Sequence, residues 1–264
     1  MSPLRCYSEA MPMMTRRKFL ALGVLALPAA AGVNAAAIEP TALRLTRLEL
    51  NPGGNLRFVQ FSDLHYKGDT RYAAEVIRTI NELAPQFVCF TGDLVEHKDF
   101  APAALDFIRQ IKAPVYGSPG NHDYWCGASF ADYEAAFAAT GGEWLVDRST
   151  VLEQHDLEIV GMALIGIHAL RPPRARRRLL LLHYPVMADR LQGPRFDLIL
   201  SGHSHGGQVR LPFIGALVLP YGVGRYDLGY FESEGGPLYV NAGIGTYRVP
   251  VRFNCRPEIT VVTM

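Results

Sequence analysis

Residues 56–65 read LRFVQFSDLH and decide the fold, because a short β-rich run leads directly into polar side chains. The same pattern recurs at FVCF (87–90) before TGDLVE, VY (115–116) before GSPGNHD, LLLL (179–182) before HYP, and LIL (198–200) before SGHSHGG. In open α/β sheets the loops beyond the carboxyl ends of the strands share one crevice. We therefore expect these five segments to converge on one site.

Strand-like and helix-like stretches alternate along the rest of the chain. The spacing of apolar residues predicts helices over 72–83, 103–111 and 130–139. Further strands are expected at 43–50, 114–116, 143–152, 157–162, 215–219, 237–241 and 258–263. This order predicts an α/β fold of two packed sheets covered by helices, in a single domain over 38–264.

The composition excludes several other classes of protein. With 49% hydrophobic and 19% charged residues, the 264-residue chain is too apolar to be disordered and too weakly charged to be a coiled coil. From residue 38 onward it has 22 basic and 24 acidic residues, a net charge of −2. A general nucleic-acid-binding protein needs a basic face, so no nucleic acid partner is expected.

Residues 1–37 are predicted to be an export signal. TRRKFL (15–20) precedes an apolar run over 20–33 and small-residue sites such as VNA (33–35) and AAA (35–37). The run is shorter than the roughly 20 residues that span a bilayer, which favours a cleaved leader over a permanent span. The paired arginines resemble a bacterial twin-arginine signal, with a buried amphipathic helix as the alternative. The expected partner is the twin-arginine export machinery, and the expected location is the periplasm or the outer face of the cytoplasmic membrane.

The four cysteines, Cys6, Cys89, Cys126 and Cys255, form no CxxC pair. This excludes a zinc ribbon and a dense disulfide scaffold. Buried or free thiols are expected, and one Cys126–Cys255 bridge formed after export remains the alternative.

The polar segments carry metal-ligand chemistry. Asp63 and His65 lie two residues apart, and residues i and i+2 of an extended strand point the same way, so both can face one ion. His203 and His205 repeat this spacing. Carboxylate, imidazole and amide ligands suit Mn, Fe or Zn, and the lack of a nearby cysteine disfavours a thiolate zinc site. Asp93 follows a glycine that allows a tight turn, and it is the expected bridge between two ions.

Each of these motifs alone is commonly structural. Five in one order, holding five of the eight histidines, favour a shared functional site over coincidence. His97, His155 and His168 belong to no motif and are expected to be surface or packing residues.

The order of the motifs resembles that of the calcineurin-like metallophosphoesterases. Their pattern D-x-H, G-D-x-x-[DE], G-N-H-[DE], H and G-H-x-H is matched at Asp63/His65, Gly92/Asp93/Glu96, Gly120/Asn121/His122/Asp123, His183 and Gly202/His203/His205. More narrowly, GHSHGGQVRLPFIGALVLP (202–220) and GIGTYRVPVRFNCRPEITVVTM (243–264) resemble the YkuE/YaeI-like bacterial branch, which includes twin-arginine-exported members. The likeness implies a four-layer α/β/β/α sandwich of two mixed sheets flanked by helices.

The resemblance also implies two divalent metal ions, Mn, Zn or Fe. It gives one ion to Asp63, His65 and His205, the other to Asn121, His183 and His203, and Asp93 to both. His122 would stay unligated and act as the catalytic residue. Glu96 and Asp123 would lie behind the ligands, in contact with the ligand residues and not with the ions. Asp123 could instead orient His122. A short segment over 163–178 and Tyr-Pro after His183 depart from the branch, which affects the expected shape of the pocket.

The chemistry implied is phosphoester hydrolysis. Two cations about 3.5–4 Å apart lower the pKa of a bridging water from 15.7 toward roughly 7, so that hydroxide is available at neutral pH. The ions also offset the charge that builds on the phosphoryl oxygens. His122 would contact a phosphate oxygen or protonate the leaving oxygen, which contributes about 10²–10⁴ in rate.

The substrate is less determined than the reaction. Phosphomonoester or phosphodiester hydrolysis at the cell envelope, on a small molecule or a lipid, is the leading hypothesis. A UDP-2,3-diacylglucosamine pyrophosphatase of lipid A biosynthesis is the alternative enzyme, although its cytoplasmic substrate fits an export leader poorly. A non-catalytic metal-dependent binding protein is another alternative, which the intact His122 disfavours, and the net charge of −2 disfavours a nuclease.

Two further groups have open interpretations. Tyr124 and Trp125 would wall the leaving-group pocket or pack in the core. The basic loop, defined as Arg171, Arg174, Arg176, Arg177 and Arg178, would steer an anionic lipid at a membrane surface or a cell-wall polymer, or would simply be solvated.

Overall fold

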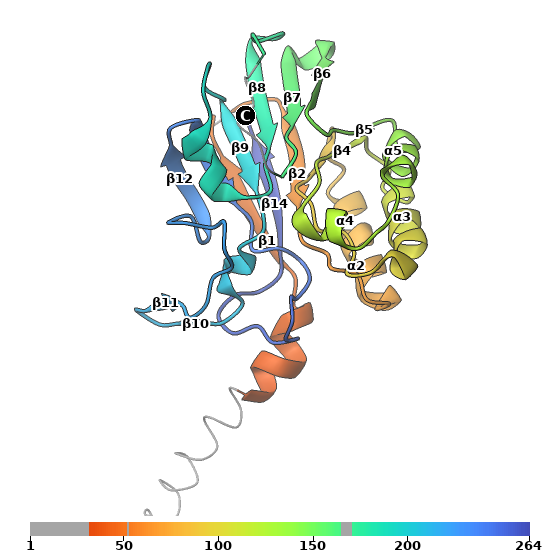
Figure 1. Ribbon diagram of the computed structural model, residues 1–264, viewed down its shortest axis with the longest axis vertical. Coiled ribbons are helices and arrows are strands. Elements are labelled where there is room, and N and C mark those ends of the chain that lie inside the picture. Colours follow the sequence, from red (N-terminus) through yellow and green to blue (C-terminus); the bar gives the residue numbers. More distant parts are fainter. Residues whose placement is uncertain (1–31, 52, 165–170) are drawn as a thin grey trace, which may run out of the picture.

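Two six-stranded sheets pack face to face in the computed structural model, which describes residues 32–51, 53–164 and 171–264 (Figure 1). The first sheet has the order β1-β14-β2-β3-β4-β5. Its strands are β1 Arg44–Glu49, β2 Arg57–Phe61, β3 Val88–Phe90, β4 Val115–Gly117, β5 Glu143–Trp144 and β14 Glu258–Thr263. β2 to β5 run parallel, whereas β14 is antiparallel to β2. The polar segments after β2, β3 and β4 therefore leave the same edge.

Three helices lie together over the outer face of the first sheet (Figure 1). They are α2 Thr70–Glu82, α3 Ala101–Arg109, which follows the short η3 Lys98–Phe100, and α5 Phe130–Ala138. In α2 the residues at helical spacing, Ala73, Val76, Ile77 and Ile80, are the buried ones. Asp69 caps this helix by accepting a hydrogen bond from the Tyr72 N–H at 3.0 Å. All three predicted helices are thus confirmed.

The second sheet has the order β12-β13-β9-β8-β7-β6. Its strands are β6 Arg148–Leu152, β7 Leu157–Gly161, β8 Arg177–Leu181, β9 Leu198–Ser201, β12 Gly229–Ser233 and β13 Gly236–Val240, and η4 Glu153–His155 joins β6 to β7. β7, β8, β9 and β13 run parallel. Its outer face is covered by the 3-10 helix η5 Pro185–Arg190, and no α-helix follows α5 in the described part of the chain. The predicted α/β class with two mixed sheets is confirmed, with a thin fourth layer.

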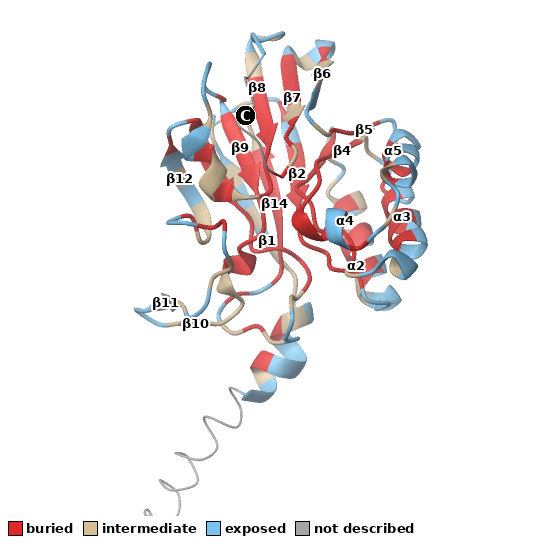
Figure 2. Cartoon of the chain, in the orientation of Figure 1, coloured by how far each residue is buried: buried red, intermediate tan, exposed pale blue. Residues whose placement is uncertain are grey.

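The alternation along β2 divides its side chains between two cores. Leu56 and Phe58 pack between the sheets against strands β8 and β9, whereas Val59 and Phe61 pack under the helices. Figure 2 shows that the central strands of both sheets are buried, whereas the outer strands β1, β6 and β12 are partly exposed. Gln60 lies between the sheets and donates to the Ser201 carbonyl at 3.0 Å, so the sheets are also joined by a polar contact.

Two strand predictions are corrected, and one strand of the second sheet was missed. The expected strand over 143–152 is two strands in different sheets, because Asp147 takes a left-handed φ of 52° between β5 and β6. β12 was not predicted. The expected strand at 215–219 is only β11 Gly215–Ala216, which pairs with β10 Arg210–Leu211 in a separate hairpin.

The predicted leader is described only from residue 32, because residues 1–31 lie outside the described residues. η1 Asn34–Ile38 and η2 Glu39–Thr41 pack on the body of the molecule. The Ala35 carbonyl accepts from the Arg252 N–H at 2.9 Å. No helix among the described residues is long and apolar enough to cross a membrane.

Candidate metal centre

Five of the seven predicted metal ligands have a left-handed backbone conformation. Their φ angles are 52° at Asp63, 43° at His65, 61° at Asp93, 68° at His203 and 49° at His205. This conformation costs an ordinary residue about 1–2 kcal/mol, and such strain clusters at functional sites. Asp63 and His65 do point toward one site, but not because they alternate along a strand as expected. β2 ends at Phe61, and the strained turn that follows it directs both side chains inward.

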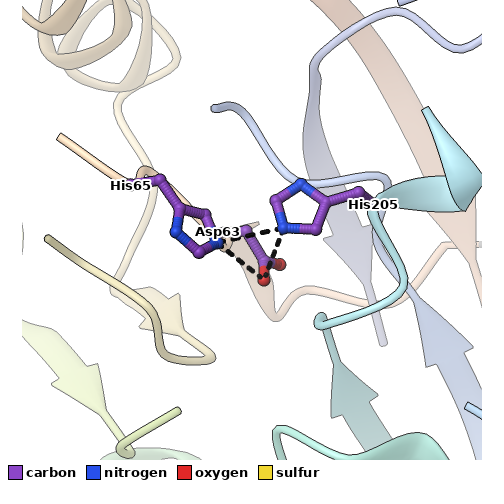
Figure 3. Close-up of side chains that lie close together, drawn as sticks. All are labelled: Asp63, His65 and His205. Atoms are coloured by element: carbon purple, nitrogen blue, oxygen red, sulfur yellow. Dashed lines mark hydrogen bonds and ion pairs between the residues drawn. The ribbon is translucent and has the colours of Figure 1, made fainter. Parts of the chain in front are cut away.

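Asp63, His65 and His205 form a first group of buried side chains whose potential ligand atoms lie within 4.8 Å of one another (Figure 3). His205 Nε2 lies 3.0 Å from His65 Nε2 and 3.6 Å from Asp63 Oδ1. Two imidazole nitrogens at this distance require a proton or a cation between them. The three atoms thus enclose a position suited to a metal ion.

Asp93, His183 and His203 form a second buried group under the same distance limit. His183 Nε2 lies 3.2 Å from Asp93 Oδ2 and 3.2 Å from Asn121 Oδ1, so Asn121 borders this group. His183 Nδ1 lies 2.6 Å from the Thr91 carbonyl. Because a carbonyl only accepts, Nδ1 carries a proton, and Nε2 is the atom that faces the group and would bind an ion there.

His203 and His205 belong to different groups, as the resemblance implies, although their spacing alone would allow both to face one ion. His203 Nε2 donates to the Tyr221 carbonyl at 2.6 Å, which leaves Nδ1 as its ligand atom. Asp93 lies between the groups, because its Oδ2 is also 3.5 Å from His65 Nε2. A third set of ligand atoms within 4.8 Å, from His65, Asp93 and His122, brings His122 to the same place.

Burial and neighbouring charges set the protonation of these groups. Burial alone would raise the pKa of Asp93, but the charge of His183 and a hydrogen bond from it hold this pKa well below its usual range. Burial alone would lower the pKa of His183, but Asp93 raises it to about 9. Burial and the charge of His183 lower the pKa of His203 to about 3, and burial also lowers that of His205. Two imidazoles are therefore neutral at pH 7, the state that binds a metal.

Glycines allow the turns to approach one another. A Cβ on Gly202 would lie 2.3 Å from Asp63 Oδ2, and a Cβ on Gly120 would lie 2.2 Å from Asp93 Oδ1. Any side chain at either position would displace a carboxylate of the site. The glycines of the GNHD and GHSH motifs thus keep space for the ligands.

Glu96 contacts His65 and His122 at the Nδ1 side of each ring. Its Oε1 lies 2.7 Å from His65 Nδ1 and its Oε2 lies 3.2 Å from His122 Nδ1. Burial alone would raise the pKa of Glu96, but these histidines hold it well below its usual range. The carboxylate therefore fixes both rings with Nε2 facing the groups.

Asp123 ties the turns together and does not orient the His122 ring. Its carboxylate accepts from the backbone N–H groups of Asp93 and Gly120, both at 2.8 Å, and from Tyr133 Oη at 3.0 Å. Burial and the charge of Asp93 raise the pKa of Asp123 to about 6. These contacts place the Asp123 carboxylate behind the ligands, which is one of the two positions expected for it.

Aromatic rings surround His122. The Trp125 ring lies 5.2 Å from it and is 65% exposed, so Trp125 forms part of an open wall. Tyr124 instead packs on Phe130, with ring centroids 5.0 Å apart. Tyr247, which was not among the predicted site residues, lies 5.1 Å from His122 and 5.8 Å from His65, measured between ring centroids.

Arg252 is a second residue that the motifs do not indicate. It is fully buried, and its guanidinium donates to the carbonyls of Ala242 at 2.9 Å, Gly243 at 3.1 Å and Cys255 at 2.9 Å. The segment that it holds supports the first group, because the Gly245 N–H donates to the Asp63 carbonyl at 2.7 Å. An arginine between apolar neighbours, VPVRF at 249–253, was the available signal.

The basic loop does not border the site. Arg178 is buried, with Nε 2.9 Å from Glu158 Oε2, so its assignment to a solvated loop is wrong. Arg177 donates to a backbone carbonyl at 2.6 Å. Both stand at the start of β8, whereas His183 follows the end of that strand.

The remaining cysteines and histidines of the described residues supply no atom to these groups, although the Cys255 thiol donates to the His205 carbonyl at 3.2 Å. Cys89, Cys126 and Cys255 are free and buried, so the alternative Cys126–Cys255 bridge is wrong. His97 is exposed, and the His155 ring lies 6.5 Å from that of Phe87. Cys6 and His168 lie outside the described residues.

The donor set fits divalent metals. Buried carboxylate oxygens and imidazole nitrogens face one another without thiolates, which is the chemistry of Mn, Fe or Zn sites. The Nε2 atoms of His65 and His205 lie only 3.0 Å apart in the first group. These features favour cations over a purely hydrogen-bonded cluster.

Comparisons with known proteins agree with this geometry. Residues 56–207 match the family described as Calcineurin-like phosphoesterase. The chain is 33% identical to the uncharacterized metallophosphoesterase YkuE of Bacillus subtilis, over 96% of this chain and 99% of that protein. It is 27% identical to the phosphodiesterase YaeI of Escherichia coli, over 96% and 100%, and 27% identical to the UDP-2,3-diacylglucosamine pyrophosphatase LpxG of Chlamydia trachomatis, over 90% and 94%. Members of the family use divalent metals, in accord with the clustered His and Asp side chains. The chain therefore belongs to the calcineurin-like phosphoesterases and is a hydrolase of phosphoester bonds.

Proposed function

We propose that this protein holds two divalent metal ions and hydrolyses phosphomonoester or phosphodiester bonds at the cell envelope. The observation that carries the proposal is the convergence of seven buried ligand side chains from both sheets, with Asp93 in contact with both groups. The envelope location rests on the leader pattern over 1–37 and on the twin-arginine motif within it.

The proposed division of the ligands between two ions follows the two groups of side chains described above. Asp63, His65 and His205 would hold one ion, Asn121, His183 and His203 the other, and Asp93 both. Such ions would lower the pKa of water and neutralise charge on a phosphoryl group. Manganese, zinc and iron all suit these ligands.

His122 is the expected proton donor to the leaving oxygen. Glu96 occupies its Nδ1 side, which leaves Nε2 for substrate. Tyr247 and the exposed Trp125 flank the ring and would restrict how a leaving group lies against it. The chain's own contribution is thus to position this imidazole beside the metal ligands.

Reconstitution tests the function directly. The metal-free protein is loaded separately with Mn, Zn, Fe or Mg and assayed on a nitrophenyl monoester, a nitrophenyl diester and a UDP-linked lipid. We expect metal-dependent hydrolysis of a monoester or diester, absent from the Asp93→Ala control. A loaded protein that binds two metal ions but releases no product from any substrate would favour the non-catalytic binding alternative.

The similarity to LpxG favours one second candidate, a UDP-2,3-diacylglucosamine pyrophosphatase. The UDP-linked lipid distinguishes it, because this enzyme would cleave the pyrophosphate and release UMP. Preference for this substrate over both nitrophenyl esters would replace the envelope proposal.

A further inference from the structure

The β10–β11 hairpin exposes an unusual run of apolar side chains. We define the apolar hairpin as residues 211–219, LPFIGALVL, which has no charged or hydrogen-bonding side chain. Phe213 is fully exposed at the turn, and Ile214, Leu217 and Val218 are 71%, 52% and 75% exposed. Single exposed apolar residues are ordinary, but a continuous exposed apolar surface marks an interaction site.

The apolar hairpin is attached to the metal centre at both of its ends. It begins six residues after His205, and the Leu217 N–H closes its base by donating to the Val209 carbonyl at 3.1 Å. Tyr221, which follows it, is 89% exposed and accepts from His203 Nε2 through its carbonyl. A partner that covers the hairpin would therefore lie directly beside the metal ligands.

Neighbouring segments extend this surface. The Arg210 N–H donates to the Phe253 carbonyl at 2.9 Å, and Arg252 holds Ala35 of η1 through its N–H. Val249, in the segment that precedes Arg252, is 57% exposed. Val33 and Ile38, at the two ends of η1, are exposed to a similar extent. Figure 1 shows the hairpin and η1 at the same end of the molecule, with the strands of both sheets extending away from it.

Exposed arginines stand in the segments that border this surface. Arg248 and Arg256 are exposed, whereas Arg210 is paired with Asp227 at 2.9 Å and Arg252 is buried. Apolar side chains beside exposed arginines match a bilayer with anionic head groups, whose interior takes the apolar groups and whose surface attracts the cations.

The sequence outside the described residues points to the same partner. The apolar run over 20–33 ends where the described chain begins, at Gly32, and η1 then joins it to the surface formed by Val249 and the hairpin. This run belongs to the predicted export leader over 1–37, which would bring the chain to the outer face of the cytoplasmic membrane, where a lipid surface is the available partner.

We propose that the apolar hairpin inserts into an anionic lipid bilayer and that the substrate is a phosphoester of an amphiphile drawn from that bilayer. The substrate class rests on the proposed function, whereas the docking surface does not. The phosphoryl group would reach the metal ligands beside Tyr221 while the apolar part of the substrate stays with the hairpin.

A fluorescent probe tests insertion. In the full chain with Cys6→Ser, Phe213→Cys is labelled with an environment-sensitive fluorophore, because Cys89, Cys126 and Cys255 are buried. Tyr230→Cys, on exposed β12 and outside the surface, is the matched control. We expect a blue shift at 213 and none at 230 on addition of vesicles of phosphatidylglycerol and phosphatidylcholine in equal parts. An unshifted signal at 213, or equal shifts at both positions, would overturn the docking surface even if the leader itself binds the vesicles.

Enzyme assays test the substrate class. The Phe213→Ser/Ile214→Ser protein should lose about 100-fold or more in hydrolysis of a vesicle-embedded phosphoester, because each of the two large apolar side chains withdrawn from lipid costs roughly a factor of ten or more. Its hydrolysis of a soluble nitrophenyl diester should equal that of the Tyr230→Ser control. Equal loss on both substrates, or self-association through the tip without vesicle binding, would overturn the proposal. If the unaltered protein hydrolyses neither ester, the proposed function fails, while the fluorescence at 213 still reports docking.

Discussion

The two sheets contribute different chemistry to one site. The turns after β2, β3 and β4 of the first sheet supply Asp63, Asp93 and Asn121 together with His65 and His122. The turns after β8 and β9 of the second sheet supply only imidazoles, His183, His203 and His205. Every carboxylate in the ligand groups therefore belongs to the first sheet.

This difference means that neither the first group nor the second group is complete within one sheet. His205 completes the group of Asp63 and His65, and His183 and His203 complete the group of Asp93. The sheets are fixed at this place by the His203 N–H, which donates to Asp63 Oδ1 at 3.0 Å. Metal binding should therefore favour the packed arrangement of the sheets, because the ligands are gathered only there.

The largest effect is expected at the carboxylate that contacts both groups. Asp93→Ala removes a charged ligand atom near His65 and His183 and should abolish metal loading and hydrolysis together. Metal content by mass spectrometry and product release give the two readouts. Asp106→Ala, an exposed aspartate in α3, is the control and should behave like the unaltered protein. Retention of both metals by Asp93→Ala would contradict the bridging position.

The next largest effect should separate chemistry from metal binding within the first sheet. His122→Ala should keep both metals and lose about 10²–10⁴ in turnover, because a positioned proton donor contributes that much. Single-turnover kinetics at saturating metal measure the loss. His97→Ala, an exposed imidazole, serves as control. If His122→Ala loses one metal instead, the third set of ligand atoms, His65, Asp93 and His122, describes a real ligand group.

The sequence predicted the first sheet better than the second for a physical reason. The helices of the first half depend on local spacing, as at Ala73, Val76, Ile77 and Ile80 in α2. β12 carries exposed and half-buried residues and owes its place to pairing with β13, which local patterns do not reveal. The break at Asp147 depends in the same way on which sheet each half joins.

The ligand residues were predictable because each motif lies in one short segment at a strand end. The residues that support the ligands could not be predicted in this way, because the groups that they contact are distant in sequence. Among the described residues Arg252 has no carboxylate partner, and its role follows only from the carbonyls that meet around it. Tyr247 is likewise brought to His65 and His122 by tertiary structure alone.

A smaller effect is expected in the segment that crosses from β13 of the second sheet to β14 of the first. Arg252→Met would leave the carbonyls of Ala242 and Cys255 buried without donors, and should lower the free energy of unfolding by about 3–5 kcal/mol. Urea unfolding of metal-free protein measures it. Arg252→Lys keeps the charge but makes fewer hydrogen bonds, so it should lose less. Equal stability of Arg252→Met and the unaltered protein would exclude a supporting role.

The smallest effect tests the polar contact between the sheets. Gln60 lies between them and donates to the Ser201 carbonyl at 3.0 Å and toward Thr91 Oγ1 at 3.3 Å. Gln60→Leu is close in volume and should cost about 1 kcal/mol of unfolding free energy, the net contribution of an ordinary hydrogen bond. Gln154→Leu, at an exposed position, is the control.

The same substitution separates packing of the sheets from metal binding. Ser201 starts the turn that carries His203 and His205, so a shift of β9 against β2 would move these imidazoles away from Asp63 and His65. We therefore expect Gln60→Leu to lower the free energy of unfolding more in metal-loaded than in metal-free protein, because the loaded protein also loses metal affinity. Equal losses would mean that the sheets keep their ligands in register without Gln60. The buried core residues between the sheets, among them Phe58 and Leu200, would then be sufficient to align the two halves of the site.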